Sequence, residues 1–183
     1  MTGSPPGING IHHLTAVSRD AQRTVDFYTG LRALRLIKKT VNFDHPSSPH
    51  LYFGVGDGAP GTIVTYVAYP HGMMRPVTMG ASLTHHFGLS VSDEDALAEW
   101  RDYLNASGVA TTEIKDRAYF RSICFHDPDG HIVEIATEIP GFTTDETESE
   151  LGQTLQLPPW LQRRRNEIER NLTPTTVRDP IGH

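Results

Sequence analysis

Two histidines and one glutamate have the types and positions that could hold a metal ion. His13 and His86 each end a His-His pair within an apolar, strand-like run, and Glu134 lies between Val133 and Ile135 in another such run. An unpaired buried carboxylate is costly, and a bound cation removes that cost. Two imidazoles and one carboxylate form a facial triad with coordination positions left open for a substrate, for O₂ or for a polarised carbonyl. We therefore predict a divalent metal site at these three residues.

The same three residues also have a simpler interpretation. A histidine on an apolar strand is often a hydrogen-bonded core or edge residue. Glu134 could face solvent on a half-exposed strand, since alternation would turn Val133 and Ile135 to the other face. A metal site is favoured because both His-His pairs stand in register across an internal repeat, with the glutamate near the end of one copy.

That weak repeat predicts the elements that must position these residues. Each copy begins with its His-His strand, at residues 11–17 and 83–91, and continues through a polar turn into an amphipathic helix, at 21–31 and 96–107. Ser92 is expected to cap the second helix. Three strand-like runs follow each helix, at 34–41, 49–54 and 62–68 in the first copy and at 111–115, 119–126 and 131–137 in the second. Both copies thus predict a βαβββ unit. In the alignment of the two copies, Thr65 occupies the position equivalent to Glu134.

The repeat also predicts how the chain is divided. Pro, Gly and Met without periodicity mark a linker between the copies, and a Pro-Pro pair marks the start of a helix in the tail. The expected parts are a flexible leader (1–8), a first module (9–69), a linker (70–82), a second module (83–138) and a C-terminal tail (139–183) with a helix at about 159–172.

Composition narrows the class of protein. The 183 residues carry a formal net charge of −6, which gives no basic surface for nucleic acid or an anionic membrane. No apolar run approaches the length of a membrane span, and the N-terminus lacks the features of a signal peptide. The single cysteine, Cys124, rules out an intrachain disulfide and suits a reducing compartment. We expect a cytoplasmic protein without nucleic-acid or membrane partners.

Short motifs spread over nearly the whole chain resemble one superfamily. The chain is similar to the vicinal oxygen chelate proteins, which include glyoxalase, bleomycin-resistance proteins and type I extradiol dioxygenases, and more narrowly to the ring-cleaving hydroquinone dioxygenases. The matching segments are GIHHLT (10–15), DFY (26–28), KKTVNFD (38–44), HLYFG (50–54), PGT (60–62), KDR (115–117), YF (119–120), DPDG (127–130), EIAT (134–137), PGFT (140–143) and LPPWL (157–161).

The resemblance implies a fold and a site. The fold is α+β, with two βαβββ modules whose mixed sheet curves like a barrel around a metal cleft. The implied ligands of Fe(II) or Mn(II), one ion per chain, are His13, His86 and Glu134, and such a ligand set would also accept zinc or nickel. The implied residues around the metal are His12, Thr15, His85 and Arg117, which could hydrogen-bond substrate oxygens or pass protons. We place Thr65, Tyr119 and Cys124 in the substrate pocket.

Two departures from the family pattern bear on activity. Typical relatives are about twice as long and have four modules, whereas this chain retains the first and last. The family also has a tyrosine ten residues before the ligand glutamate, where this chain has Cys124, so a phenol is replaced by a weak thiol donor.

The expected function is therefore a metal-dependent, extradiol-type ring-cleaving dioxygenase that uses O₂ to open a hydroquinone or catechol-like phenol. One alternative is a glyoxalase-like metal-dependent isomerase or lyase, which Thr65 disfavours because such enzymes use a fourth protein ligand at that position. Another is a bleomycin-resistance-like protein that binds an aromatic ligand without turnover. We also expect a homodimer, since small paired-module proteins often exchange or pair modules.

Overall fold

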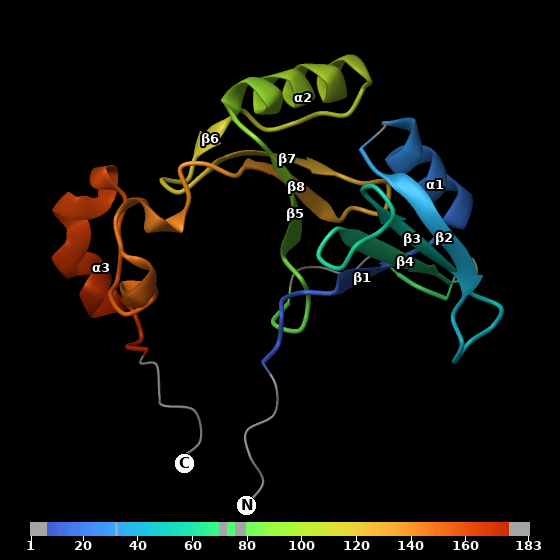
Figure 1. Cartoon of the computed structure of the whole chain (residues 1–183), viewed down its shortest axis with the longest axis horizontal. Coiled ribbons are helices and arrows are strands. Elements are labelled where there is room, and N and C mark those ends of the chain that lie inside the picture. Colours follow the sequence, from blue (N-terminus) through green and yellow to red (C-terminus); the bar gives the residue numbers. More distant parts are fainter. Residues whose placement is uncertain (1–6, 32, 70–72, 76–79, 176–183) are drawn as a thin grey trace, which may run out of the picture. The chain divides into compact units, whose positions relative to one another are not determined.

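A computed structural model describes residues 7–31, 33–69, 73–75 and 80–175 (Figure 1). The expected order of elements, βαβββ twice followed by a helical tail, is confirmed. The first module comprises β1 (His13–Ser18), α1 (Ala21–Gly30), β2 (Arg35–Val41), β3 (Pro49–Gly54) and β4 (Ile63–Ala68). The second comprises β5 (His86–Val91), α2 (Glu94–Ala106), β6 (Lys115–Asp116), β7 (Arg121–His126) and β8 (Ile132–Thr137). The tail holds the 3₁₀ helices η1 (Phe142–Thr144), η2 (Glu148–Glu150) and η3 (Pro159–Arg164), then α3 (Arg165–Asn171).

The first module is one mixed sheet with a helix packed on it. Its strand order is β1-β4-β3-β2, with β1 parallel to β4 and the other neighbours antiparallel. Asp20 caps α1 by accepting a hydrogen bond from the backbone of Arg23, and the helix buries Tyr28 against Phe53 and Tyr66. Because β4 is the central partner of both β1 and β3, it holds together the strands that carry the first-module site residues.

The second module forms its own four-stranded sheet, in the order β5-β8-β7-β6. The cap of α2 differs from the prediction. The carboxylate of Asp93 accepts the backbone N–H of Ala96, while the Ser92 hydroxyl donates to that same carboxylate. A carboxylate at this position also interacts favourably with the positive end of the helix dipole, which explains why Asp93 rather than Ser92 is the cap.

Two further sequence-based expectations are wrong in detail. The strand expected at 111–115 is reduced to the two residues of β6. Thr112 donates its backbone N–H to the carbonyl of Cys124, but the Cys124 N–H goes to the Thr112 hydroxyl instead of its carbonyl, and Thr111 is held by the side chain of Asn105. The tail helix expected at about 159–172 is divided into η3 and α3. Most of the expected linker at 70–82 and the first six residues of the expected leader lie outside the described residues.

The α+β class is confirmed, but the barrel-like closure is not. Each module forms a separate four-stranded sheet, so the hydrogen-bonded strands do not run from one module into the other. Chain contacts define two compact units. The first includes Met1–His86 together with Ser107–Val109 and His126–Val133, and the second includes the remainder. No helix within the described residues is long and apolar enough to span a bilayer.

A buried carboxylate ties the turn before β8 to the first module within the first unit. Asp127 accepts hydrogen bonds at 3.1 Å from the hydroxyls of both Tyr28 and Tyr66, which themselves lie 2.5 Å apart. It also accepts the backbone N–H groups of Asp129 and His131, and it contacts the His131 ring at 3.0 Å. Asp129, in turn, accepts side-chain hydrogen bonds from Arg19 and Arg23 around the start of α1.

These contacts, together with burial, shift the pKa values of the groups involved. The hydrogen bond to Asp127 raises the pKa of His131 above its ordinary value, against the opposing effect of burial. Burial would raise the pKa of Asp127, but the hydrogen bond and charge of His131 outweigh it and lower that pKa overall. Burial raises the pKa values of Tyr28 and Tyr66, so both phenols stay protonated and donate. Below the raised pKa of His131, the network is therefore an ion pair held by neutral donors.

We predict that this ion pair makes stability depend on pH. The contribution of His131 is fully present below the ordinary histidine pKa of about 6.5 and is lost as pH rises through its raised folded pKa. The contribution of Asp127 is present above about pH 3.9 and is lost as pH falls through its lowered folded pKa. His131→Asn keeps a donor near Nδ1 but removes the titration. Urea unfolding should show wild type losing about 1 kcal/mol relative to the variant between about pH 5.5 and pH 8.5.

Parallel pH profiles of wild type and His131→Asn would contradict this assignment. His126→Asn, an exposed histidine on the same hairpin, is the matched control and should leave the profile unchanged.

Candidate metal centre

Both His-His pairs adopt the same local geometry. The Nδ1 atoms of His12 and His13 lie 2.9 Å apart, and those of His85 and His86 lie 2.8 Å apart. The rings meet edge to face in each pair, with centroids 5.1 and 5.0 Å apart. Within each hydrogen bond one ring donates and the other accepts, so the first histidine of a pair orients the second. Fixing a ligand imidazole through its other ring nitrogen is a usual feature of metal sites.

Glu134 does not face solvent. It is only 6% exposed on β8, and its neighbours Val133 and Ile135 are buried on the opposite side of the strand. A β-carbon built on Gly88 of β5 would lie 4.0 Å from the Glu134 carboxylate. Strand alternation puts His86 on the same face of β5 as Gly88. The sheet therefore presents a proposed imidazole ligand and the proposed carboxylate ligand on one face.

Arg117 accompanies this carboxylate within the second unit. Its Nη2 lies 4.0 Å from Oε1 of Glu134, and its Nε donates to the buried hydroxyl of Ser122 at 3.3 Å. Because the Arg117 side chain is 43% exposed, the ion pair is partly screened and its main effect is orientation. The guanidinium stands where it could stabilise a negatively charged oxygen beside Glu134.

The corresponding face of the first sheet carries a hydrogen-bonded chain of uncharged groups. His13 and Thr15 alternate onto one face of β1, and Thr15 is paired in register with Thr65 of β4. The Thr65 hydroxyl donates to Thr15 at 2.9 Å and contacts Nε2 of His50 at 2.9 Å. Burial first, and the charge of His13 second, lower the pKa of His50. The sequence interpretation assigned no role to His50, although it lies in the quoted HLYFG motif.

The other two expected pocket residues are differently engaged. The Tyr119 hydroxyl donates to Asp145 at 3.1 Å, and its ring lies 5.3 Å from that of Phe142, so it contacts the tail. Cys124 is half-buried on β7. Burial, together with the charge of Glu134, raises the pKa of the Cys124 thiol, which therefore stays protonated at neutral pH. It can donate only a weak hydrogen bond.

The donor types fit the metals that the resemblance implies. Two imidazoles oriented by neighbouring histidines and a buried carboxylate are suitable for Fe(II) or Mn(II), and also accept zinc or nickel. Within residues 7–31, 33–69, 73–75 and 80–175, however, no group of three His, Cys, Asp or Glu side chains converges closely enough to hold an ion. The ligand set of His13, His86 and Glu134 thus stays a prediction.

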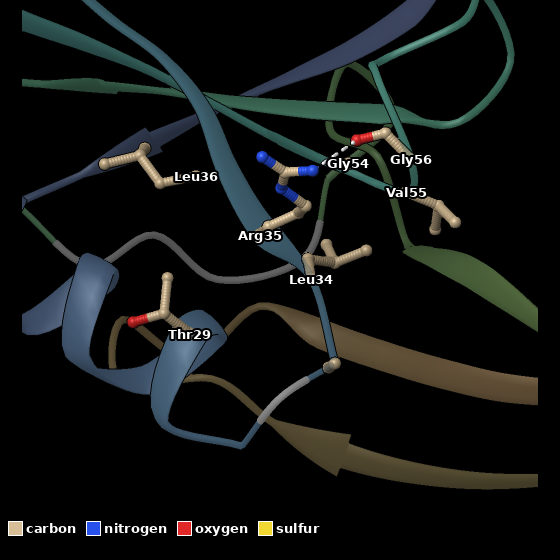
Figure 2. A pocket seen from close by; sticks show the side chains of 8 residues that line it. Thr29, Leu34, Arg35, Leu36, Gly54, Val55 and Gly56 are labelled. Carbon is tan, nitrogen blue, oxygen red and sulfur yellow. Dashed lines mark hydrogen bonds between the residues drawn. The ribbon is translucent and has the colours of Figure 1, made fainter.

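A separate pocket lies in the first module, where α1 ends beside β2 and the β3–β4 turn (Figure 2). It is an open depression of about 460 Å³, in which Arg35 donates to the carbonyl of Gly56 at 3.1 Å. Its lining residues are Thr29, Ala33, Leu34, Arg35, Leu36, Gly54, Val55 and Gly56. None of the predicted site residues lines it, so its chemistry is unrelated to that of the histidine pairs.

Comparison with known proteins identifies the class to which the fold and these residues belong. The sequence profile of the Glyoxalase/Bleomycin resistance protein/Dioxygenase superfamily matches residues 10–135, more than half of the chain. The chain belongs to this superfamily. The matched region contains both histidine pairs and Glu134.

Among its members, the chain is similar to ring-cleaving dioxygenases. It is 24% identical to a Bacillus subtilis (strain 168) protein named "Putative ring-cleaving dioxygenase MhqO", over 93% of this chain and 97% of the relative. That alignment has 304 positions, 121 more than the 183 residues of this chain, so a long stretch of the relative has no counterpart here. The chain is also 29% identical to the chlorohydroquinone/hydroquinone 1,2-dioxygenase of Sphingobium indicum, over 70% of this chain and 40% of that enzyme.

Solved structures agree on the fold. A glyoxylase/bleomycin resistance protein/dioxygenase domain from Frankia sp. EAN1pec superposes with a TM-score of 0.59 at 15% identity, covering 72% of this chain and 98% of that one. At this identity the similarity concerns the fold alone.

We predict that protein purified without oxygen binds about one equivalent of iron or manganese per chain, measured by elemental analysis. Glu134→Ala should lose this metal, because two imidazoles alone do not complete the ligand set. Glu138→Ala, an exposed glutamate just past the end of β8, is the matched control and should retain it. Metal-free wild type that cannot be reconstituted would show that the histidine pairs are structural, and equal metal in the two variants would show that Glu134 is not a ligand.

Proposed function

We propose that this protein is a metal-dependent, extradiol-type ring-cleaving dioxygenase that acts on a hydroquinone or a catechol-like phenol. The observation that carries the proposal is the buried carboxylate of Glu134 on the same sheet face as His86, with an equivalent histidine pair at His13. The similarity to proteins named as ring-cleaving dioxygenases supports it.

In this proposal His13, His86 and Glu134 hold Fe(II) or Mn(II), one ion per chain. The bound metal supplies open coordination positions at which O₂ and a phenolic oxygen can be brought together. The ring opens beside a hydroxyl group, and both atoms of O₂ enter the product, so no further oxidant or reductant is needed.

The surrounding residues have distinct proposed roles. Arg117, a permanent cation beside Glu134, stabilises negative charge on a substrate oxygen but cannot take up a proton. His12 and His85 orient the ligand histidines through their Nδ1 contacts, and His85 can also pass protons. The thiol of Cys124 donates only a weak hydrogen bond, so it is a poor replacement for the phenol that the family pattern has at this position. Proton transfer therefore depends on the histidines.

Thr65 argues against an isomerase or lyase mechanism of the glyoxalase kind. It occupies the position equivalent to Glu134 in the first module, where such an enzyme would need a fourth ligand. Its hydroxyl is fully buried and hydrogen-bonded to both His50 and Thr15. A side chain used in this way is a poor metal ligand.

A small aromatic substrate and O₂ are the proposed partners, and the proposed form is a cytoplasmic homodimer. Since this chain lacks more than a hundred positions present in MhqO, a second copy is the simplest source of additional substrate wall. Light scattering at micromolar concentration measures the oligomeric state directly.

We predict that metal-loaded protein consumes O₂ when hydroquinone is added, in equal amounts with ring-opened product. His86→Ala should reduce the rate at least about a thousandfold, because the metal is no longer held. Arg117→Met should retain metal and reduce kcat about a hundredfold, because one charge-stabilising donor is lost. An oxygen electrode together with mass spectrometry of the product measures both effects.

The matched control is Arg121→Met, because Arg121 pairs with Glu94 at the surface, away from Glu134. Hydroquinone that binds fully metal-loaded protein without any O₂ consumption would overturn the enzyme proposal in favour of a binding protein of the bleomycin-resistance kind.

A further inference from the structure

We propose that His50 is a positioning residue that sets the direction of a hydrogen-bond chain across the first sheet, so that the hydroxyl proton of Thr15 is left to donate to an oxygen of the bound ligand. The direction of the chain follows from the first module alone. The identity of the acceptor as a phenolic oxygen rests on the proposed function.

The hydrogen-bond chain crosses three adjacent strands. Its members are Tyr52 and His50 of β3, Thr65 of β4 and Thr15 of β1. Tyr52 is paired in register with Thr65, and Thr65 with Thr15, so the side chains stand on one face of the sheet. The links measure 3.4 Å from Tyr52 to His50, 2.9 Å from His50 to Thr65 and 2.9 Å from Thr65 to Thr15.

The number of protons on each group fixes the donor-to-acceptor direction of the hydrogen-bond chain. A threonine hydroxyl has one proton to donate, and Thr65 donates it to Thr15. Thr65 can therefore only accept from Nε2 of His50, which requires the proton of His50 to be on Nε2. The other ring nitrogen, Nδ1, is then an acceptor, and the Tyr52 hydroxyl lies in position to donate to it. His50 and Thr65 thus each accept from one neighbour and donate to the next.

Burial and charge are consistent with this assignment. Burial and the nearby His13 lower the pKa of His50, which favours a neutral ring with a single N–H group. The ring of His50 stacks on that of Tyr52 with centroids 4.4 Å apart, which restrains its rotation. Thr65 is fully buried, so no water competes for its hydroxyl.

The hydrogen-bond chain ends at Thr15, an exposed residue near the proposed metal ligand His13. Thr15 is exposed and lies two residues from His13 on the same face of β1. Because Thr15 accepts from Thr65, its own proton is not used in that bond and can donate to a group bound on this face. A phenolic oxygen placed there would accept this proton.

The first test measures the proton on His50 directly. Long-range ¹H–¹⁵N correlation spectra of the labelled full chain distinguish Nε2–H from Nδ1–H rings, and the His50→Gln spectrum assigns the signal. We expect His50 to be the Nε2–H form at neutral pH. Thr65→Val should shift it toward a mixture because the acceptor is lost, whereas Thr65→Ser and the control Thr40→Val, on the neighbouring strand, should not. A Nδ1–H ring, or an unchanged spectrum in Thr65→Val, would overturn the proposal.

The second test measures ligand binding. Calorimetry of the metal-loaded protein with hydroquinone, in the absence of O₂, should show about tenfold weaker binding in Thr15→Val, Thr65→Val and His50→Leu. Thr65→Ser and His50→Gln retain the required hydroxyl or N–H group and should stay within about threefold of wild type. Equal losses in Thr65→Ser and Thr65→Val would mean that shape rather than hydrogen-bond direction matters, and the proposal would fail.

The two tests separate the two proposals. Wild type that fails to bind hydroquinone would contradict the proposed substrate, and the spectra would still decide the direction of the chain. If wild type and all five variants bind hydroquinone equally well, the role of Thr15 is contradicted while the proposed enzyme stays intact.

Discussion

The carboxylate of Asp127 is the contact on which the orientation of β4 and the turn before β8 depend. It is buried and satisfied by two protonated tyrosines, two backbone N–H groups and His131. Tyr66 is the residue after Thr65 on β4, and β8 begins directly after the Asp127 turn, two residues before Glu134. Because strand residues alternate between faces, holding Tyr66 on the core side holds Thr65 on the other. A slip of one residue in β4 would break the network and turn Thr65 to the other face.

The two modules use equivalent positions for different chemistry. Each begins with a histidine pair of nearly identical geometry, and each has a last strand whose buried polar residue shares a face with that pair. In the second module this residue is Glu134, accompanied by Arg117 and by a raised pKa at Cys124. In the first module it is Thr65, which passes a hydrogen bond from His50 to Thr15. The second module therefore carries charged groups at these positions, and the first carries neutral hydrogen-bond donors.

Its length distinguishes this chain from the relatives it resembles. The alignment with MhqO extends over many more positions than this chain has residues, yet it includes nearly all of this chain. The residues predicted to bind metal all lie within the family match at 10–135. Retaining the candidate ligands while losing a long stretch of chain is compatible with the same metal chemistry and a differently bounded substrate space.

Local patterns in the sequence determined the repeat, the order of elements and the α+β class, because strand alternation and helix periodicity act over a few residues. They also singled out His13, His86 and Glu134 as candidates. They could not decide that Glu134 is buried, that Asp93 rather than Ser92 caps α2, or that the tail helix is divided. The role of His50 was hidden for the same reason. Its partners are fifteen and thirty-five residues away along the chain, and only strand pairing brings them within hydrogen-bonding distance and gives their protons a direction.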